Sequence, residues 1–147
     1  MRLFAHPIHT LLVHFPIAFW TLATFCDGLA VLGFMDAWRA GAILIGLGVS
    51  MGAIAMIPGL IDLAKLPSEA EKSGLTHIAF MLTAWCFYFG SLFLHIEDKA
   101  LSHEPDLSAL ILSIIGFCCL MIGGFFGGEL VYRHGAGQLG KKLRVEK

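Results

Sequence analysis

The chain alternates between long apolar runs and short polar segments. Four continuous apolar runs occupy residues 10–35, 37–60, 75–94 and 107–131. Each run reaches the ~20 residues that a helix rising 1.5 Å per residue needs to cross a ~30 Å hydrocarbon layer. The runs do not alternate with a period of two, so the pattern does not favour a β-barrel. Because backbone groups in lipid must be hydrogen-bonded within their own segment, we expect four transmembrane helices.

The polar segments between these runs are short, at residues 36–39, 62–74 and 95–106. Short connections place consecutive helices side by side and antiparallel. The sequence therefore predicts an all-α fold, a single integral membrane four-helix bundle over residues 1–147. The composition agrees, because 57% of the residues are hydrophobic and 14% are charged, against about 45–50% and about 25% in soluble domains.

Basic residues are concentrated on one predicted side of the membrane. With four spans, both termini and the segment 62–74 share that side, which holds eight of the ten Lys and Arg residues: Arg2, Lys65, Lys72, Arg133, Lys141, Lys142, Arg144 and Lys147. Because basic residues favour the cytoplasmic side, we expect a multi-pass protein of the bacterial inner membrane with both termini cytoplasmic. The first ten residues lack the pattern of a cleaved signal peptide. The basic tail is expected to meet anionic membrane lipids, and a net charge of −1 gives no indication of nucleic-acid binding.

Small residues recur at a spacing of four in the second and fourth runs. The pairs are Gly48 with Gly52, Gly123 with Gly127, and Gly124 with Gly128. Such spacing lets helix backbones approach closely, within the bundle or in a homo-oligomer. The alternative is close approach of a flat ligand such as a porphyrin. The four cysteines lie inside apolar runs without a Cys-x-x-Cys pair, so we expect small apolar side chains rather than disulfides.

Histidines and carboxylates gather at the predicted cytoplasmic level of all four helices. Ionisable side chains in spans are costly and usually face the bundle interior. The set comprises His6, His9, His14, His77 and His134, together with Asp62 and Glu129. Pro7 predicts a fixed entry loop before the first helix. We expect His14 to face inward, and we expect Pro58 to break the second helix just before Asp62.

Two cofactor interpretations fit this set. Haem b needs axial histidines at equal depth, for which His14 and His77 are the first candidates and His134 the next. Polar groups near its propionates would come from Arg133, Tyr132, His6 and His9. A bare transition-metal ion needs three or four ligands, available from His9, His14, His77, His134, Asp62 and Glu129. The alternative to both is that each histidine is an interfacial hydrogen-bonding group and that Glu129 pairs with Arg133, four residues later.

The opposite half of the membrane holds fewer ionisable groups. Asp27 lies inside the first apolar run, and His95 ends the third run at a comparable level. A contact between these two side chains, or a proton path from that side, is compatible with the sequence.

The two ends of the chain resemble a known family. The segments HPIHTLLVHFPIA and GGELVYRHGAG, with GLIDL around Asp62 and His77 opening the third helix, are similar to a bacterial membrane family classed as domain of unknown function 2231. The resemblance implies a four-helix inner-membrane domain. Because some relatives are joined to c-type cytochrome domains, it also implies a c-type cytochrome or another redox subunit as partner, which favours haem. It implies no particular reaction.

The leading interpretation is thus a b-type haem protein that passes electrons within the membrane. A metal-ion binding or transport protein that uses the same cluster is the second. A structural subunit of a larger membrane complex is the third. The residues do not decide whether the protein is an enzyme.

Overall fold

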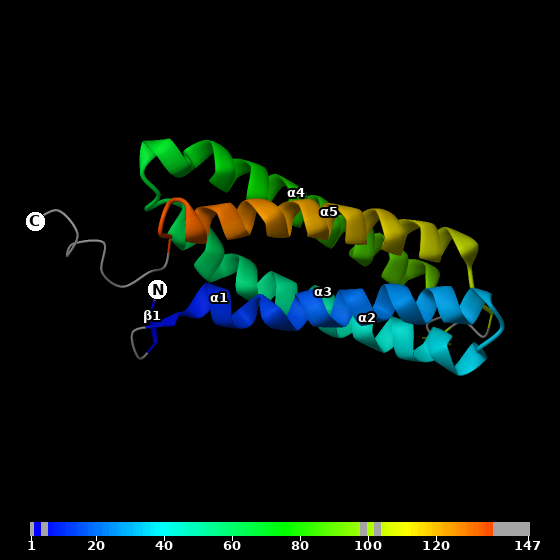
Figure 1. Cartoon of the computed structure of the whole chain (residues 1–147). Coiled ribbons are helices and arrows are strands. Elements are labelled where there is room, and N and C mark those ends of the chain that lie inside the picture. The colour runs from blue at the N-terminus through cyan, green and yellow to red at the C-terminus, as the bar shows by residue number, and fades with distance from the viewer. Residues whose placement is uncertain (1, 4–5, 98–99, 102–103, 137–147) are drawn as a thin grey trace, which may run out of the picture.

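The computed structural model describes residues 2–3, 6–97, 100–101 and 104–136, and this part of the chain is dominated by helix (Figure 1). The helices are α1 (Ile8–Leu12), α2 (His14–Val31), α3 (Met35–Leu63), α4 (Ser68–Leu94) and α5 (Leu107–Tyr132). Two-residue strands form two small antiparallel hairpins, β1 (Arg2–Leu3) with β2 (His6–Pro7) and β3 (Ile96–Glu97) with β4 (Ala100–Leu101).

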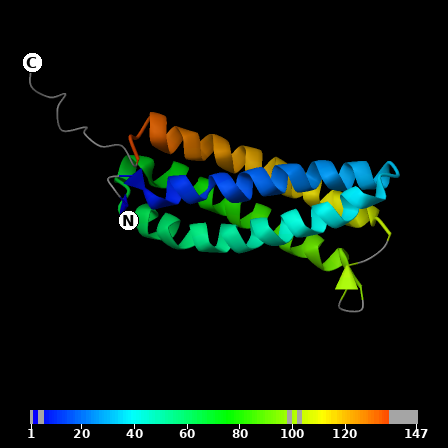
Figure 2. The same ribbon diagram turned by 90° about the horizontal axis from the view of Figure 1, so that it is seen from below.

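Four helical segments are long and apolar enough to cross a membrane. They are Ile8–Val31, Met35–Leu63, Ser68–Leu94 and Leu107–Tyr132. The first segment contains α1 and α2, which are separated only by a turn at Val13. The predicted all-α membrane bundle is therefore confirmed, and Figures 1 and 2 show the four segments packed along one common direction.

Two helix boundaries differ from the prediction. α4 begins at Ser68 rather than at residue 75, because Pro67 is extended and Glu69 lies in the first turn, where a carboxylate is favourable. α3 continues through Pro58 to Leu63, so the expected break before Asp62 is wrong. Proline is tolerated inside membrane helices when a neighbouring group satisfies the disturbed carbonyls.

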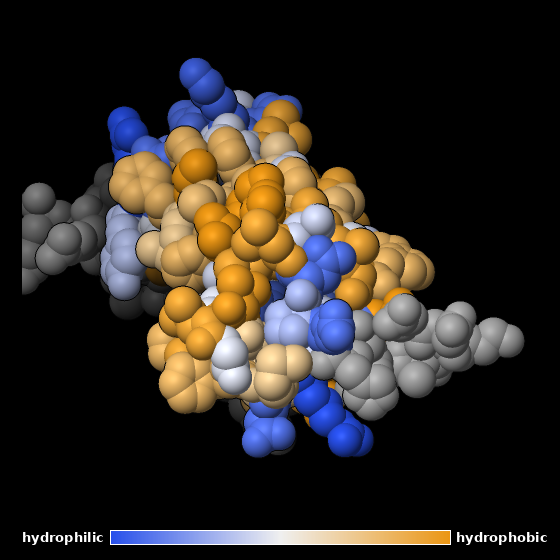
Figure 3. Space-filling model, turned by 90° about the vertical axis from the view of Figure 1, so that its right-hand side faces the viewer, coloured by the Kyte–Doolittle hydropathy of each residue, from blue (hydrophilic) through white to orange (hydrophobic). Residues whose placement is uncertain are grey.

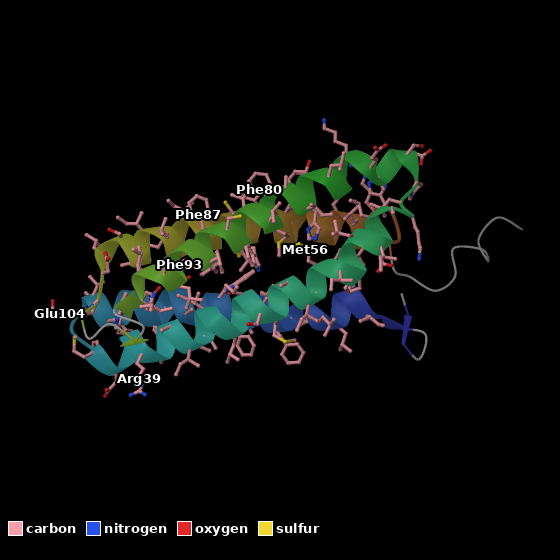
Figure 4. The ribbon with its side chains drawn as sticks, turned by 180° about the vertical axis from the view of Figure 1, so that it is seen from behind. Arg39, Met56, Phe80, Phe87, Phe93 and Glu104 are labelled. Atoms are coloured by element: carbon pink, nitrogen blue, oxygen red, sulfur yellow. The ribbon has the colours of Figure 1, made fainter. Side chains whose placement is uncertain are left out.

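The two ends of the bundle carry different segments. The N-terminal end holds the start of α1, the α3–α4 connection and the end of α5 (Figure 1). The opposite end holds the α2–α3 turn and the α4–α5 connection. Arg39 and Glu104 lie at that opposite end (Figure 4).

The bundle is made of two similar helical hairpins. The first hairpin is α1–α2 with α3, and the second is α4 with α5. Because α2 and α4 run in the same direction, equivalent residues face each other at one depth, with a constant offset of 68 residues. The facing pairs are His9 with His77, Trp20 with Tyr88, and Asp27 with His95. Parallel repeats of this kind are related by a pseudo-two-fold axis along the membrane normal.

The second helices of the two hairpins, α3 and α5, are related by the same offset of 68 residues. Glycines of α3 make room for side chains of the first hairpin, and glycines of α5 make room for the equivalent side chains of α4. Gly48 and Gly116 adjoin Trp20 and Tyr88, while Gly59 and Gly127 adjoin His9 and His77. Of the glycines in the predicted small-residue pairs, Gly48 and Gly127 are therefore used for packing inside the bundle.

Apolar side chains fill the middle of the bundle and cover its outside. The central cluster contains Trp20, Ala23, Ile45, Val49, Ala84, Tyr88 and Leu120. Figure 4 marks Phe80, Phe87 and Phe93 spread along α4, and Phe93 is 61% exposed. Seen from the opposite end, the surface is mostly apolar with small separate hydrophilic patches (Figure 3). Along the helices, exposed apolar side chains such as those of Phe25, Ile57 and Phe125 suit contact with lipid.

Candidate functional site

His9 and His77 face each other at the N-terminal end of the bundle. His9 lies on α1 and His77 on α4, and both side chains are half-buried. Their ring centroids are 6.4 Å apart, and the ring planes are inclined at 82°. The two imidazoles are equivalent members of the two hairpins, so they meet where the pseudo-two-fold axis passes.

Both histidines are held by the same kind of hydrogen bond. Nδ1 of His9 lies 2.9 Å from the carbonyl oxygen of Ala55, and Nδ1 of His77 lies 2.7 Å from that of Gly123. A carbonyl oxygen only accepts, so Nδ1 carries the hydrogen in each ring and donates it. Each bond connects residues 46 positions apart, as expected from the repeat.

In the neutral ring, a hydrogen on Nδ1 leaves a lone pair on Nε2. Among the described residues, neither Nε2 has a hydrogen-bond partner. An imidazole whose Nδ1–H is bound to a backbone carbonyl, with Nε2 available, is the usual state of a metal-ligating histidine. The pair therefore has the chemistry of two neutral nitrogen ligands.

Two glycines create the space for these rings. A Cβ atom at Gly59 would lie 2.7 Å from Cε1 of His9, and one at Gly127 would lie 3.0 Å from Cε1 of His77. Each glycine is four residues after the carbonyl that its histidine binds. The backbones of α3 and α5 thus approach the imidazoles directly, and a larger residue at either position would displace a ring.

His14 lies on the outer surface of the bundle. Its side chain is exposed, so the expectation that it faces inward is wrong. The buried face of α2 carries Pro16, Trp20, Ala23, Asp27 and Ala30. His14 precedes Pro16 by two residues, which turns it about 200° around the helix from that face.

Glu129 is held by two neighbouring side chains. Its Oε1 accepts a hydrogen bond from the guanidinium of Arg133 at 2.8 Å. Its Oε2 accepts a hydrogen bond from the hydroxyl of Ser73 at 2.8 Å. The pairing with Arg133 four residues later is therefore present, as the simpler interpretation expects. Tyr132 is 88% exposed.

Glu129, Tyr132 and Arg133 border a surface groove rather than the pair of His9 and His77. The groove has a volume of about 420 Å³ and is lined by Gly124, Phe125, Gly128, Glu129, Tyr132 and Arg133. Of the four glycines paired in the fourth apolar run, for which a porphyrin is the alternative to helix packing, Gly124 and Gly128 line this outward groove. Gly123 adjoins Met81, and Gly127 adjoins His77.

The remaining candidates contribute less to the site. Asp62 lies half-buried in the last turn of α3, and His134 lies half-buried just after α5. The side chain of His6 is outside the described part of the structure. Within the described ranges, no three His, Cys, Asp or Glu side chains converge on a point where they could hold a metal ion.

A second polar pair lies at the opposite end of the bundle. Nε2 of His95 is 3.0 Å from Oδ1 of Asp27, and both side chains are completely buried. Oδ2 of Asp27 accepts a hydrogen bond from the hydroxyl of Ser113 at 2.6 Å. The ring of Trp38 stacks on the imidazole of His95, with the ring centroids 3.7 Å apart. The contact between Asp27 and His95 that the sequence allowed is present. The contributions of Ser113 and Trp38 were not anticipated, because the sequence does not show which faces of α3 and α5 turn towards this pair.

Comparison with known proteins gives one result about the whole chain. The search of curated proteins found no match, and the search of solved structures found none either. A family model described as "Predicted membrane protein (DUF2231)" matches residues 5–140, which include the HPIH segment, the two histidine-bearing helices and the GGELVYRH segment. The chain belongs to this membrane protein family.

Proposed function

We propose that the protein binds haem b between its two hairpins and passes electrons, with His9 and His77 as axial ligands. The observation that carries this proposal is the facing pair of imidazoles, both anchored through Nδ1 to a backbone carbonyl and both without a partner for Nε2 among the described residues. This assignment replaces the pair of His14 and His77 that the sequence favoured, because His14 lies on the outer surface.

The ring separation fits two ligands on opposite sides of one metal ion. A metal–nitrogen bond to histidine is about 2.0–2.1 Å long, and the ring centroid lies about 1.1 Å behind the nitrogen. Two imidazoles on opposite sides of an ion therefore have centroids about 6.3 Å apart on that bond length. The observed separation is 6.4 Å.

The number of protein ligands favours haem over a bare ion. A bare zinc or similar ion takes four ligands, at least three of them usually from protein. The described residues offer two at this point. A haem iron needs only one or two protein ligands, and when bound it supplies reversible one-electron chemistry.

The protein's own residues would tune such a centre. The hydrogen bonds from Nδ1 to Ala55 and Gly123 hold the rings in place and make Nε2 a better electron donor to a metal. We further propose that the N-terminal end faces the cytoplasm of a bacterial inner membrane, because eight of the ten basic residues belong to that side. The histidine pair then lies near the cytoplasmic surface, where a redox partner would approach.

An absorbance spectrum with metal analysis of the detergent-purified protein tests the proposal. Cells supplied with haem precursor should yield a Soret band with low-spin features, and iron together with porphyrin. The variants His9→Gln and His77→Gln should each lose the low-spin features. The matched control His14→Gln changes a histidine on the outer surface and should keep them.

Each other outcome has a definite meaning. Metal without porphyrin, lost in the same two variants, would replace haem by the metal-ion alternative. A preparation without a Soret band and without metal would refute both. Equal effects of all three substitutions would show that the spectrum does not depend on the His9–His77 pair.

A further inference from the structure

The outward groove on α5 is used neither by the packing of the bundle nor by the candidate haem site. All of its lining residues belong to α5 and the residue that follows it, so it opens away from the other helices. Gly124 and Gly128 give it depth, and a Cβ atom at Gly124 would meet no atom within 4 Å apart from local helix backbone. The rings of Phe125 and Tyr132 also line it and are 71% and 88% exposed. The groove is therefore an open, mostly apolar channel on the surface that faces lipid.

The groove runs from the headgroup level towards the middle of the membrane. The last spanning segment ends at Tyr132, and tyrosine is typical of the membrane–water interface. Gly124 lies eight residues earlier, about 12 Å deeper by helical rise. One leaflet of a ~30 Å hydrocarbon layer is about 15 Å thick. The groove thus covers most of one leaflet, along the direction in which a lipid acyl chain lies.

The headgroup end of the groove carries one acidic and one basic side chain, one helical turn apart. Arg133 donates from Nη1 to Glu129 at 2.8 Å, and its side chain is 74% exposed. A guanidinium has five N–H donors, so this contact leaves donors at the surface. Glu129 is 21% exposed and accepts from Ser73 and Arg133, while an ionised carboxylate has about four acceptor sites. Within the described part of the chain, the hydroxyl of Tyr132 has no hydrogen-bond partner.

We propose that this groove binds one phosphatidylethanolamine molecule of the adjoining leaflet. An acyl chain lies over Gly124 and Gly128, where helix backbone is open to contact. The phosphate accepts hydrogen bonds from Arg133 and Tyr132, and the ammonium donates to Glu129. This site does not depend on the proposed haem.

Charge complementarity selects this headgroup over the other common ones. A base and an acid side by side match a phosphate linked to an ammonium. Phosphatidylglycerol offers the phosphate to Arg133 but brings no cation to Glu129. Phosphatidylcholine has both charges, but its quaternary ammonium has no N–H donor for a carboxylate. Hydrogen bonds to charged groups contribute enough to make each mismatch cost about tenfold in affinity.

Native mass spectrometry of the delipidated full-length protein in detergent tests the proposal. Dioleoyl phosphatidylethanolamine, phosphatidylglycerol and phosphatidylcholine are added at equal concentrations, so that only the headgroup differs. The wild type should bind one phosphatidylethanolamine about tenfold more tightly than either of the other two lipids. Glu129→Gln should remove the preference over phosphatidylcholine, and Arg133→Gln should weaken binding of all three lipids because all contain the phosphate.

A leucine placed in the groove tests its position. Gly124→Leu fills the channel and should abolish binding of the single lipid. Gly46→Leu is the matched control on α3, because a Cβ atom there also meets no atom within 4 Å apart from local helix backbone, and it should keep the lipid.

The three lipids on the wild type decide the headgroup even if a variant fails to fold. Equal binding of all three, or tighter binding of phosphatidylglycerol, would overturn the assigned chemistry. Unchanged binding in Gly124→Leu would overturn the assigned place. A wild-type dimer that Gly124→Leu converts to a monomer would make the groove a contact between two copies and would also overturn the proposal.

Discussion

Replacing Gly59 by alanine tests the close approach of α3 to His9. The added Cβ would lie 2.7 Å from Cε1 and 2.9 Å from Nδ1 of the ring, so the ring must move by about 0.7 Å to reach an ordinary contact. Overpacking of this kind costs about 1–3 kcal/mol. Breaking the hydrogen bond from Nδ1 to the carbonyl of Ala55 adds about 0.5–1.5 kcal/mol. We therefore expect Gly59→Ala to lower the free energy of unfolding by about 1.5–4.5 kcal/mol.

Gly46→Ala is the matched control on the same helix. A Cβ atom at Gly46 has no other atom within 4 Å, apart from its own local helix backbone, and alanine is the better helix former by about 1 kcal/mol in soluble helices. Unfolding of both purified variants with sodium dodecyl sulfate in mixed micelles, followed by circular dichroism, measures the difference. If the two variants unfold within about 0.5 kcal/mol of each other, the size of an ordinary surface substitution, the proposed contact between α3 and His9 is refuted.

The same variant has a consequence for the proposed haem. Metal–ligand distances are tolerated within about 0.2 Å, so a ring displaced by about 0.7 Å no longer ligates an ion held on the axis. A preparation that carries haem should therefore change from low-spin to high-spin absorbance in Gly59→Ala and stay low-spin in Gly46→Ala. A low-spin spectrum in both variants would contradict ligation by His9 while leaving the stability result intact.

Further substitutions extend the same reasoning to the second hairpin. Gly127→Ala places a Cβ atom 3.0 Å from the ring of His77 and should lower the free energy of unfolding by about 1–2 kcal/mol. A Cβ atom at Gly124 meets no atom within 4 Å apart from local helix backbone, so Gly124→Ala should not lower it. The same detergent titration measures both variants. Tyr88→Phe removes a hydroxyl 2.7 Å from Thr24 but keeps the ring, so it should lose about 1 kcal/mol while the near-ultraviolet circular dichroism of the stacked aromatics persists. A change in that spectrum would mean that the hydroxyl also positions the ring.

The sequence predicts the spans well because the membrane sets their length. Apolar runs must cover a fixed thickness, so the four helices follow from hydropathy alone. The helix ends are less well predicted, since they depend on local chemistry at the interface. α4 extends back to Ser68 through a polar segment that includes Glu69 and Lys72, and polar residues in such a segment resemble those of a loop.

The candidate site was predicted in part. The correct depth follows from hydropathy, and His9 and His77 were both among the candidates. The rotational position of His14 was not predicted, because apolar residues surround every membrane helix and hide its inner face. The missing information is the offset of 68 residues, which pairs His9 with His77 and makes the exposed Leu82 the equivalent of the exposed His14.

The pseudo-two-fold axis explains why the two polar pairs differ in what they need. At the opposite end the equivalent residues are an aspartate and a histidine, Asp27 and His95, which hydrogen-bond to each other at 3.0 Å. At the N-terminal end the equivalent residues are both histidines, His9 and His77, and the bonds to Ala55 and Gly123 place a hydrogen on Nδ1 of both rings. Two imidazoles that both present a lone pair cannot hydrogen-bond to each other. Two such lone pairs are satisfied by a group that meets both of them, either a metal centre, as proposed above, or a water molecule that donates two hydrogen bonds.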